Sequence, residues 1–218
     1  MKTTRIHAPC IATTLLLLTL LLITEARPHD LGEVAHYQVI NAVGLPGTLQ
    51  LDLNGNARPH RYPPGAIMSS MGTSAGQITY SGHHCACRDA VARDVLLPSG
   101  MVTTVAFFPA ITRSKLTGEI TRANLEIASL RHPFTRHGKT KTIHLLAVTE
   151  SPRLPISING TIQPLRRLCP TAVTLHGDAF NIALDGVRLA HGKFDERDHL
   201  ACIVFDAPGG GIRAVVFD

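Results

Sequence analysis

An internal repeat places the strongest constraint on the fold. Shifting the sequence by 105 residues lays Tyr37–Pro59 over Thr142–Pro164 without a gap, with six identities in 23 positions. Self-similarity at a fixed spacing indicates one structural unit written twice. A second, shorter match follows in each copy, where Gln77–Gly82 resembles Asn181–Gly186. The repeat therefore predicts two tandem domains of similar fold.

The repeated unit has the pattern of a β-hairpin. Leu49–Leu53 alternates apolar and polar residues, and so does Leu154–Ile158 apart from its proline. Strict alternation indicates a strand that buries one face. Both strands run into an Asn-Gly pair, Asn54-Gly55 and Asn159-Gly160, and Asn-Gly is the strongest short signal for a hairpin turn because both positions tolerate positive φ.

Composition extends this pattern to the whole chain. The 18 glycines and 14 prolines suit many short strands joined by turns, and the absence of tryptophan implies an aliphatic core. Each copy ends on an apolar run, Met101–Phe108 and His199–Phe205. We expect a mainly β protein with two tandem small β-sandwich (Greek-key-like) domains, over residues 36–110 and 141–218. Small partial barrels are the alternative.

The N-terminus predicts export. Lys2 and Arg5 precede an apolar run over Leu15–Ile23, and Thr24-Glu25-Ala26 has small residues where a signal peptidase cuts. Residues 1–26 are therefore predicted to be a cleaved signal peptide, and the protein to be periplasmic or secreted. A membrane anchor is the alternative, but the run from Ile11 to Ile23 is shorter than the roughly 20 residues that span a bilayer.

Export bears on the cysteines. Cys85, Cys87, Cys169 and Cys202 remain after the predicted cleavage. An oxidising compartment permits disulfides, and four cysteines allow three pairings that the sequence leaves open.

Residues 111–140 form a predicted basic connector between the domains. Seven basic side chains against Glu119 and Glu126 give the stretch from Thr112 to Lys141 a net charge of +5, equal to that of the whole chain. The basic residues are Arg113, Lys115, Arg122, Arg131, Arg136, Lys139 and Lys141. Such a strip suits an acidic partner, an anionic polymer or an anionic lipid surface, and a solvated linker is the plain alternative. The apolar residues from Ile120 to Leu130 are compatible with a strand or a short helix that ends at Pro133.

One segment matches a hydrolase motif in sequence but not in its expected structural context. Gly72-Thr73-Ser74-Ala75-Gly76 fits G-x-S-x-G, whose serine reacts only at a sharp turn from a strand into a helix. Here a strand-like segment, Gln77–Tyr80, follows directly. We therefore expect a small-residue loop between strands, no catalytic residue and no enzyme.

A dense group of potential metal ligands follows. His83, His84, Cys85 and Cys87 offer imidazole and thiolate, the ligands that Cu(I) and Zn(II) favour. The alternative is an exposed loop whose cysteines form disulfides. No cofactor is predicted, and nucleic-acid binding is not expected because the basic segment contains a single aromatic residue, Phe134.

The layout resembles a known family. The starts of the two domains, Tyr37–Ala42 and Ile143–Val148, and the lead-in Pro133–Lys139 are similar to the periplasmic accessory protein of bacterial alginate O-acetylation. The resemblance in layout covers nearly the whole mature chain. It implies a non-catalytic protein that binds subunits of an envelope polysaccharide-modifying complex or the acidic polysaccharide, with no catalytic residue to carry over. We therefore expect an exported adaptor for exopolysaccharide O-acetylation or secretion, and a periplasmic metal-binding protein is the alternative.

Overall fold

The computed structural model describes residues 34–136, 138 and 140–217, and the regular elements in this part of the chain are β-strands. The predicted signal peptide lies outside the described residues. The strands of the first half are β1 (Val34–Asn41), β2 (Leu49–Leu53), β3 (Asn56–Tyr62), β4 (Ile67–Ser74), β5 (Gly76–His84), β6 (Val91–Leu97), β7 (Met101–Arg113) and β8 (Ile120–Pro133). Those of the second half are β9 (Lys141–Ala147), β10 (Arg153–Ile158), β11 (Thr161–Arg166), β12 (Thr171–Leu175), β13 (Ala179–Leu184), β14 (Val187–Lys193), β15 (His199–Asp206) and β16 (Ile212–Phe217).

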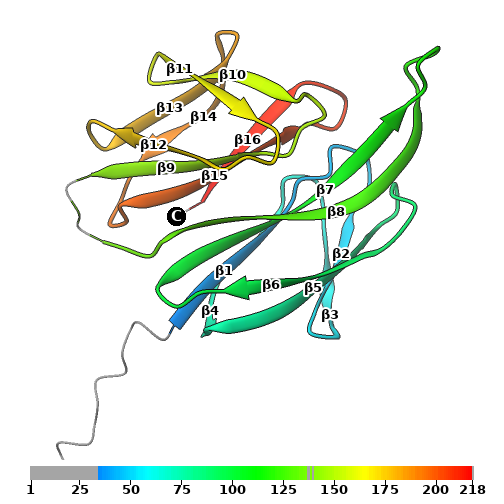
Figure 1. Ribbon diagram of the computed structural model, residues 1–218, viewed down its shortest axis with the longest axis horizontal. Helices are drawn as coiled ribbons and strands as arrows, with labels where there is room; N and C mark the ends of the chain where they lie inside the picture. The colour runs from blue at the N-terminus through cyan, green and yellow to red at the C-terminus, as the bar shows by residue number, and fades with distance from the viewer. Residues whose placement is uncertain (1–33, 137, 139, 218) are drawn as a thin grey trace, which may run out of the picture.

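The two halves have the same topology. Sheets β4-β1-β7-β8 and β3-β2-β5-β6 make the first half, and sheets β12-β9-β15-β16 and β11-β10-β13-β14 make the second. Adding eight to each strand number of the first half reproduces the second, including the parallel pairing of β1 with β7 and of β9 with β15. Each pair of sheets encloses its own apolar core, so the prediction of two tandem β-sandwich domains is confirmed (Figure 1).

A third core joins the two sandwiches. It lies between β4-β1-β7-β8 and β12-β9-β15-β16 and includes Ile40, Phe108, Leu146 and Phe205, each almost fully buried. The middle strands therefore bury both faces: in β7, Phe107 packs in the first sandwich and Phe108 packs between the sandwiches. Two-sided burial explains why these strands are continuous apolar runs, unlike the alternating outer strands.

The predicted hairpins form at both Asn-Gly pairs. Positive φ values occur at Asn54 (52°), Gly55 (77°), Asn159 (48°) and Gly160 (84°), as two-residue hairpin turns of the type I′ class require. The Asn54 side chain also accepts a hydrogen bond of 2.8 Å from the backbone N–H of Thr79 on β5. The Asn159 side chain accepts the equivalent bond, also of 2.8 Å, from the N–H of Asn181 on β13. These bonds tie each hairpin to the strand beside it.

The same bonds correct part of the sequence comparison. They make Thr79 structurally equivalent to Asn181, whereas the alignment of Gln77–Gly82 with Asn181–Gly186 paired Gln77 with that asparagine. The slip is two residues, which leaves the same side chains on the buried face because a strand repeats every second residue. Apolar pattern alone therefore could not detect it.

The segment 111–140 differs from the predicted connector. Its first residues end β7, and residues 120–133 form β8, which pairs with β7 over thirteen residue pairs and completes the inner sheet of the first sandwich. Ala123, Leu125 and Ile127 alternate into the first core. The first repeat thus ends one strand later than residue 110, and Arg122 and Arg131 occupy exposed positions of that strand.

Candidate functional site

Three histidines meet at one end of the interface between the sandwiches. His132 comes from β8, His144 from β9 and His199 from β15, on the strand faces that turn toward the other sandwich. The rings of His132 and His144 have centroids 5.5 Å apart, and those of His144 and His199 are 5.2 Å apart. Nε2 of His144 lies 2.9 Å from Nδ1 of His199. Sequence reasoning missed this cluster because its members lie far apart in the chain and belong to no motif.

Burial keeps these rings neutral. It lowers the pKa of His132 to about 4, and the nearby His144 and His199 oppose its protonation further. Burial and then His199 also lower the pKa of His144 to about 4. Nδ1 of His132 lies 3.1 Å from the carbonyl oxygen of Pro133, the one acceptor in reach, so the neutral ring carries its proton on Nδ1. The cluster is thus an uncharged polar contact between domains.

A cationic and aromatic layer covers this end of the interface. The ring of Phe134 stacks on His36 with centroids 4.2 Å apart. The guanidinium carbons of Arg136 and Arg197 lie 5.5 Å and 5.1 Å from the centroid of the same ring. Contacts of this kind between a guanidinium and an aromatic face are favourable. They hold the segment after β8 against the loop before β15.

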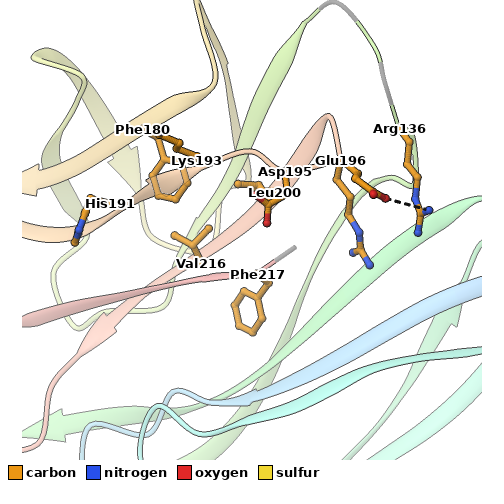
Figure 2. Close-up of a pocket in the computed structure, with 10 residues that line it drawn as sticks. Arg136, Phe180, His191, Lys193, Asp195, Glu196, Leu200, Val216 and Phe217 are labelled. Carbon is orange, nitrogen blue, oxygen red and sulfur yellow. Dashed lines mark ion pairs between the residues drawn. The ribbon is translucent and has the colours of Figure 1, made fainter.

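Next to this layer is an open cleft of about 680 Å³ (Figure 2). Its lining carries both signs of charge: Arg136, Lys193 and Arg197 are basic, and Asp195 and Glu196 are acidic. Arg136 pairs with Glu196 at 3.5 Å. Phe180, Leu200, Val216 and Phe217 supply the apolar part of its lining. A cleft of mixed charge with no unpaired cluster of one sign offers no strong field for a charged ligand.

The predicted basic strip is dispersed over the surface. Arg113 forms a two-pronged pair with Glu150 of the second sandwich, Arg122 pairs with Asp89, and Arg136 with Glu196. Lys141 is nearly buried and holds Asp198 at 3.2 Å. Among the described residues, Lys115 and Arg131 have no acidic partner within ion-pair distance, and Lys139 lies outside them. Much of the positive charge therefore serves structure.

Lys115 lies at the tip of a long arm. The β7–β8 hairpin runs past the rest of the first sandwich, and its last turn covers residues 114–119 (Figure 1). The Ser114 hydroxyl accepts hydrogen bonds from the backbone N–H groups of Leu116 and Thr117, both at 3.2 Å, and Arg113 donates to the Gly118 carbonyl at 3.0 Å. This ordered turn leaves the Leu116 side chain 97% exposed.

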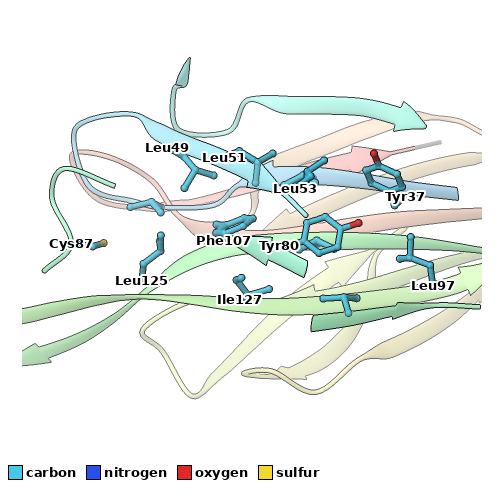
Figure 3. Close-up of a cluster of buried hydrophobic side chains, with 14 of the residues drawn as sticks. Tyr37, Leu49, Leu51, Leu53, Tyr80, Cys87, Leu97, Phe107, Leu125 and Ile127 are labelled. Atoms are coloured by element: carbon cyan, nitrogen blue, oxygen red, sulfur yellow. The ribbon is translucent and has the colours of Figure 1, made fainter. Parts of the chain in front are cut away.

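The group of potential metal ligands is divided by the fold. His83 and His84 end β5, so their side chains point to opposite faces: His83 is exposed and His84 is fully buried. Cys87 belongs to the first core (Figure 3), whereas Cys85 is exposed at the turn. Within the described residues, no three His, Cys, Asp or Glu side chains are arranged to hold a metal ion.

The four described cysteines are free thiols, with Cys85 and Cys169 exposed and Cys87 and Cys202 buried. Burial, and then the neighbouring Cys85, raises the pKa of Cys87 to about 11. Burial raises the pKa of Cys202 to about 12. The disulfide pairings that the sequence left open are not formed in this structure.

Ser74 does not lie at a nucleophile elbow. It is the last residue of β4, one residue separates it from β5, and no helix follows. His36, on the adjacent strand β1, has its ring stacked on Phe134 rather than paired with a serine. Within the described residues, Ser74 makes no side-chain hydrogen bond to a histidine, so the G-x-S-x-G match has no structural counterpart.

Comparisons with known proteins add little. No family model matches the chain, and no curated protein matches it either. Among solved structures, the Bacillus anthracis TIE protein aligns with 79% of this chain at 8% identity and a TM-score of 0.27, and the alignment spans half the length of that structure. In the described part of the chain, no helix has the length and apolarity needed to cross a membrane.

Proposed function

We propose that this chain is an exported, non-catalytic adaptor that binds a protein subunit of a machinery that modifies or secretes an envelope polysaccharide. The observation that carries the proposal is the β7–β8 arm, which presents Leu116 and Lys115 on an ordered turn. An apolar side chain carried on an ordered backbone turn requires less of the backbone to become ordered on binding, so it suits insertion into a pocket of a partner.

The body of the protein supports this role by bracing the arm. Arg113, at the base of the tip, bonds Glu150 through two nitrogens, both at 2.7 Å, and Glu150 in turn donates its backbone N–H to Asp206 at 2.7 Å. The arm of the first sandwich is therefore fixed to the second. A rigid body with a fixed projecting contact point has the properties expected of an adaptor.

The distribution of charge favours a protein partner over a polyanion. Four of the six described basic residues of the segment already have acidic partners, which leaves little continuous positive surface for a long anionic chain. Lys115 beside Leu116 instead suits a small apolar pocket with an acidic rim.

The experiment uses the full exported protein as bait against the membrane-bound acyltransferase subunits of its own organism, with an immobilised acidic polysaccharide in parallel. Leu116→Asp should abolish capture of the subunit. Ile162→Asp is the matched control, because Ile162 is 69% exposed on the other sandwich, and it should bind normally. If the wild type retains no subunit at low salt, or both variants bind equally well, the proposal fails.

A further inference from the structure

The turn after β5 carries an exposed thiol, Cys85, and a buried thiol, Cys87, and it begins at the buried imidazole of His84. The backbone N–H of Cys87 donates to the carbonyl of His84 at 2.9 Å, which closes a tight turn over His84-Cys85-Ala86-Cys87. Two Cα atoms two residues apart lie within about 7 Å, so the sulfur atoms can meet without movement of the domain. The turn therefore keeps the two backbone positions within the Cα separation that a disulfide spans, while the Cys85 side chain is exposed and the Cys87 side chain packs in the first core.

His84 has one ring nitrogen without a partner. Nδ1 accepts the backbone N–H of Ala86 at 3.2 Å, so the neutral ring carries its proton on Nε2. Nε2 is buried and has no hydrogen-bond partner among the described residues. A buried donor left unpaired is unfavourable, and such a group calls for a functional explanation.

The Cys85 sulfur and the His84 imidazole both lie against the backbone of Gly47. A Cβ at Gly47 would clash with Sγ of Cys85 and would lie 3.0 Å from Cε1 and 3.5 Å from Nε2 of His84. Its φ of +130° also favours glycine. The absence of a side chain at this position lets the thiol and the imidazole edge pack against the same point of the chain.

Cys85 lies at an open hollow of about 490 Å³, which it lines together with Leu45, Arg88 and Arg122. Arg122 is paired with Asp89 at 3.8 Å, so Arg88 is the lining cation without an acidic partner among the described residues. A thiolate is the reactive form of cysteine, and nearby cations and N–H donors stabilise it. Cys169, a free and exposed thiol on the other sandwich, provides an internal comparison.

We propose that Cys85 and Cys87 form a thiol–disulfide exchange site, in which Cys85 reacts first, Cys87 resolves and the His84 Nε2–H stabilises the Cys85 thiolate. The Cys85 thiolate attacks a small-molecule disulfide, forms a mixed disulfide and releases one thiolate. Cys87 then loses its proton to solvent and attacks the Cys85 sulfur, which forms the Cys85–Cys87 disulfide and releases the second thiolate. In total, two protein thiols become one disulfide and one external disulfide becomes two thiols.

The test uses the reduced full protein with EDTA and the uncharged probe 2,2′-dithiodipyridine. We expect Cys85 to react at least tenfold faster than Cys169. Cys169→Ser should still release two equivalents of thiopyridone quickly and end two mass units lighter. Cys87→Ser should release one from this site and keep the thiopyridyl group on Cys85, and Cys85→Ser should lose the fast phase.

His84 is tested as a positioning residue by a pair of variants. His84→Gln carries an amide N–H near the position of Nε2 and should keep the fast rate, whereas His84→Asn reaches only the position of Nδ1 and should slow Cys85 to the rate of Cys169. The proposal is overturned if wild-type Cys85 reacts no faster than Cys169, or if Cys169→Ser protein stays a mixed disulfide at Cys85. Both of these measurements use proteins with His84 intact, so they hold even if the histidine variants fail to fold.

Discussion

Nε2 of His144 lies 2.9 Å from Nδ1 of His199, within an interface that also buries His132. A contact between two imidazoles needs one proton between the facing nitrogens, so it exists only while at least one ring is neutral. Both rings belong to the second sandwich, and His132 of the first sandwich stacks against them. The stability of the junction between the sandwiches therefore depends on proton concentration.

The first prediction concerns pH. The folded-state pKa values of His132 and His144, about 4, lie below the unfolded value of 6.5, so the unfolded chain binds more protons between these limits. The free energy of unfolding should therefore be highest above about pH 6.5, where both histidines are neutral in either state, and should decrease as the pH falls toward 4. A difference of about 2.5 in pKa corresponds to about 3 kcal/mol for the buried His132. Urea unfolding between pH 7.5 and 4 measures it.

Charged groups near the histidine cluster also influence its protonation, and a variant outside the cluster serves as the control. Arg197 opposes protonation of His132, whereas Asp198 favours protonation of His199. His132→Leu should flatten the pH dependence, and the exposed-site variant His176→Gln should leave it unchanged. An equally steep loss of stability in His132→Leu would show that other groups are responsible.

The second prediction concerns cooperativity. Phe108 lies in the core shared by the sandwiches and is 1% exposed, so Phe108→Ala should lower the free energy of unfolding by about 3–5 kcal/mol. Because the shared core couples the halves, calorimetry of the wild type should show one transition. In Phe108→Ala the transition should broaden or split, whereas Phe180→Ala, in the second core alone, should weaken the second sandwich first. Two well-separated transitions in the wild type would contradict the coupling.

The third prediction concerns the hairpin turns. Gly160 has a φ of +84° and open space where a Cβ would project, so Gly160→Ala adds backbone strain without a clash. We expect a loss of about 1–2 kcal/mol. Gly55→Ala, at the equivalent turn, should behave alike, and the double variant should show the sum because the sites are distant. Chemical denaturation measures all three, and a neutral Gly160→Ala would argue against this turn geometry.

The fourth prediction distinguishes Lys141, whose charge stabilises the fold, from Lys115, whose charge we propose contacts the partner. Burial alone would raise the pKa of Asp198, but hydrogen bonds from Gly138 N–H and Lys141, together with the charge of Lys141, outweigh it and lower the pKa. Lys141→Met would leave that carboxylate buried and unpaired, at a loss of about 3–5 kcal/mol of stability.

Partner capture distinguishes the two lysines. Lys141→Met should bind the acyltransferase subunit normally at a temperature where it stays folded. Lys115→Glu, at the arm tip, should bind weakly and keep wild-type stability. The reverse pattern would return the binding role to Lys141.

The sequence was informative where a local rule sets the structure. Asn-Gly pairs fix hairpins through positive φ, and the repeat predicted both sandwiches. The end of the first domain was misplaced because Arg122 and Arg131 gave β8 the look of a charged linker, although Ala123, Leu125 and Ile127 alternate as strand residues do.

The relations between distant segments could not be read from the sequence. His132, His144 and His199 come together through sheet pairing and the packing of two sandwiches, neither of which leaves a local pattern. One signal was present: the apolar runs ending at Phe108 and Phe205 have no polar face, which indicates strands covered on both sides.

The shared core has a consequence for any attempt to divide the protein. A fragment ending near residue 136 would expose Ile40, Phe108 and Leu130 to water, and the complementary fragment would expose Leu146, Ile203 and Phe205. Contiguous apolar patches of this kind drive aggregation. The halves are alike in topology, but each covers an apolar face of the other, so we expect either half expressed alone to aggregate.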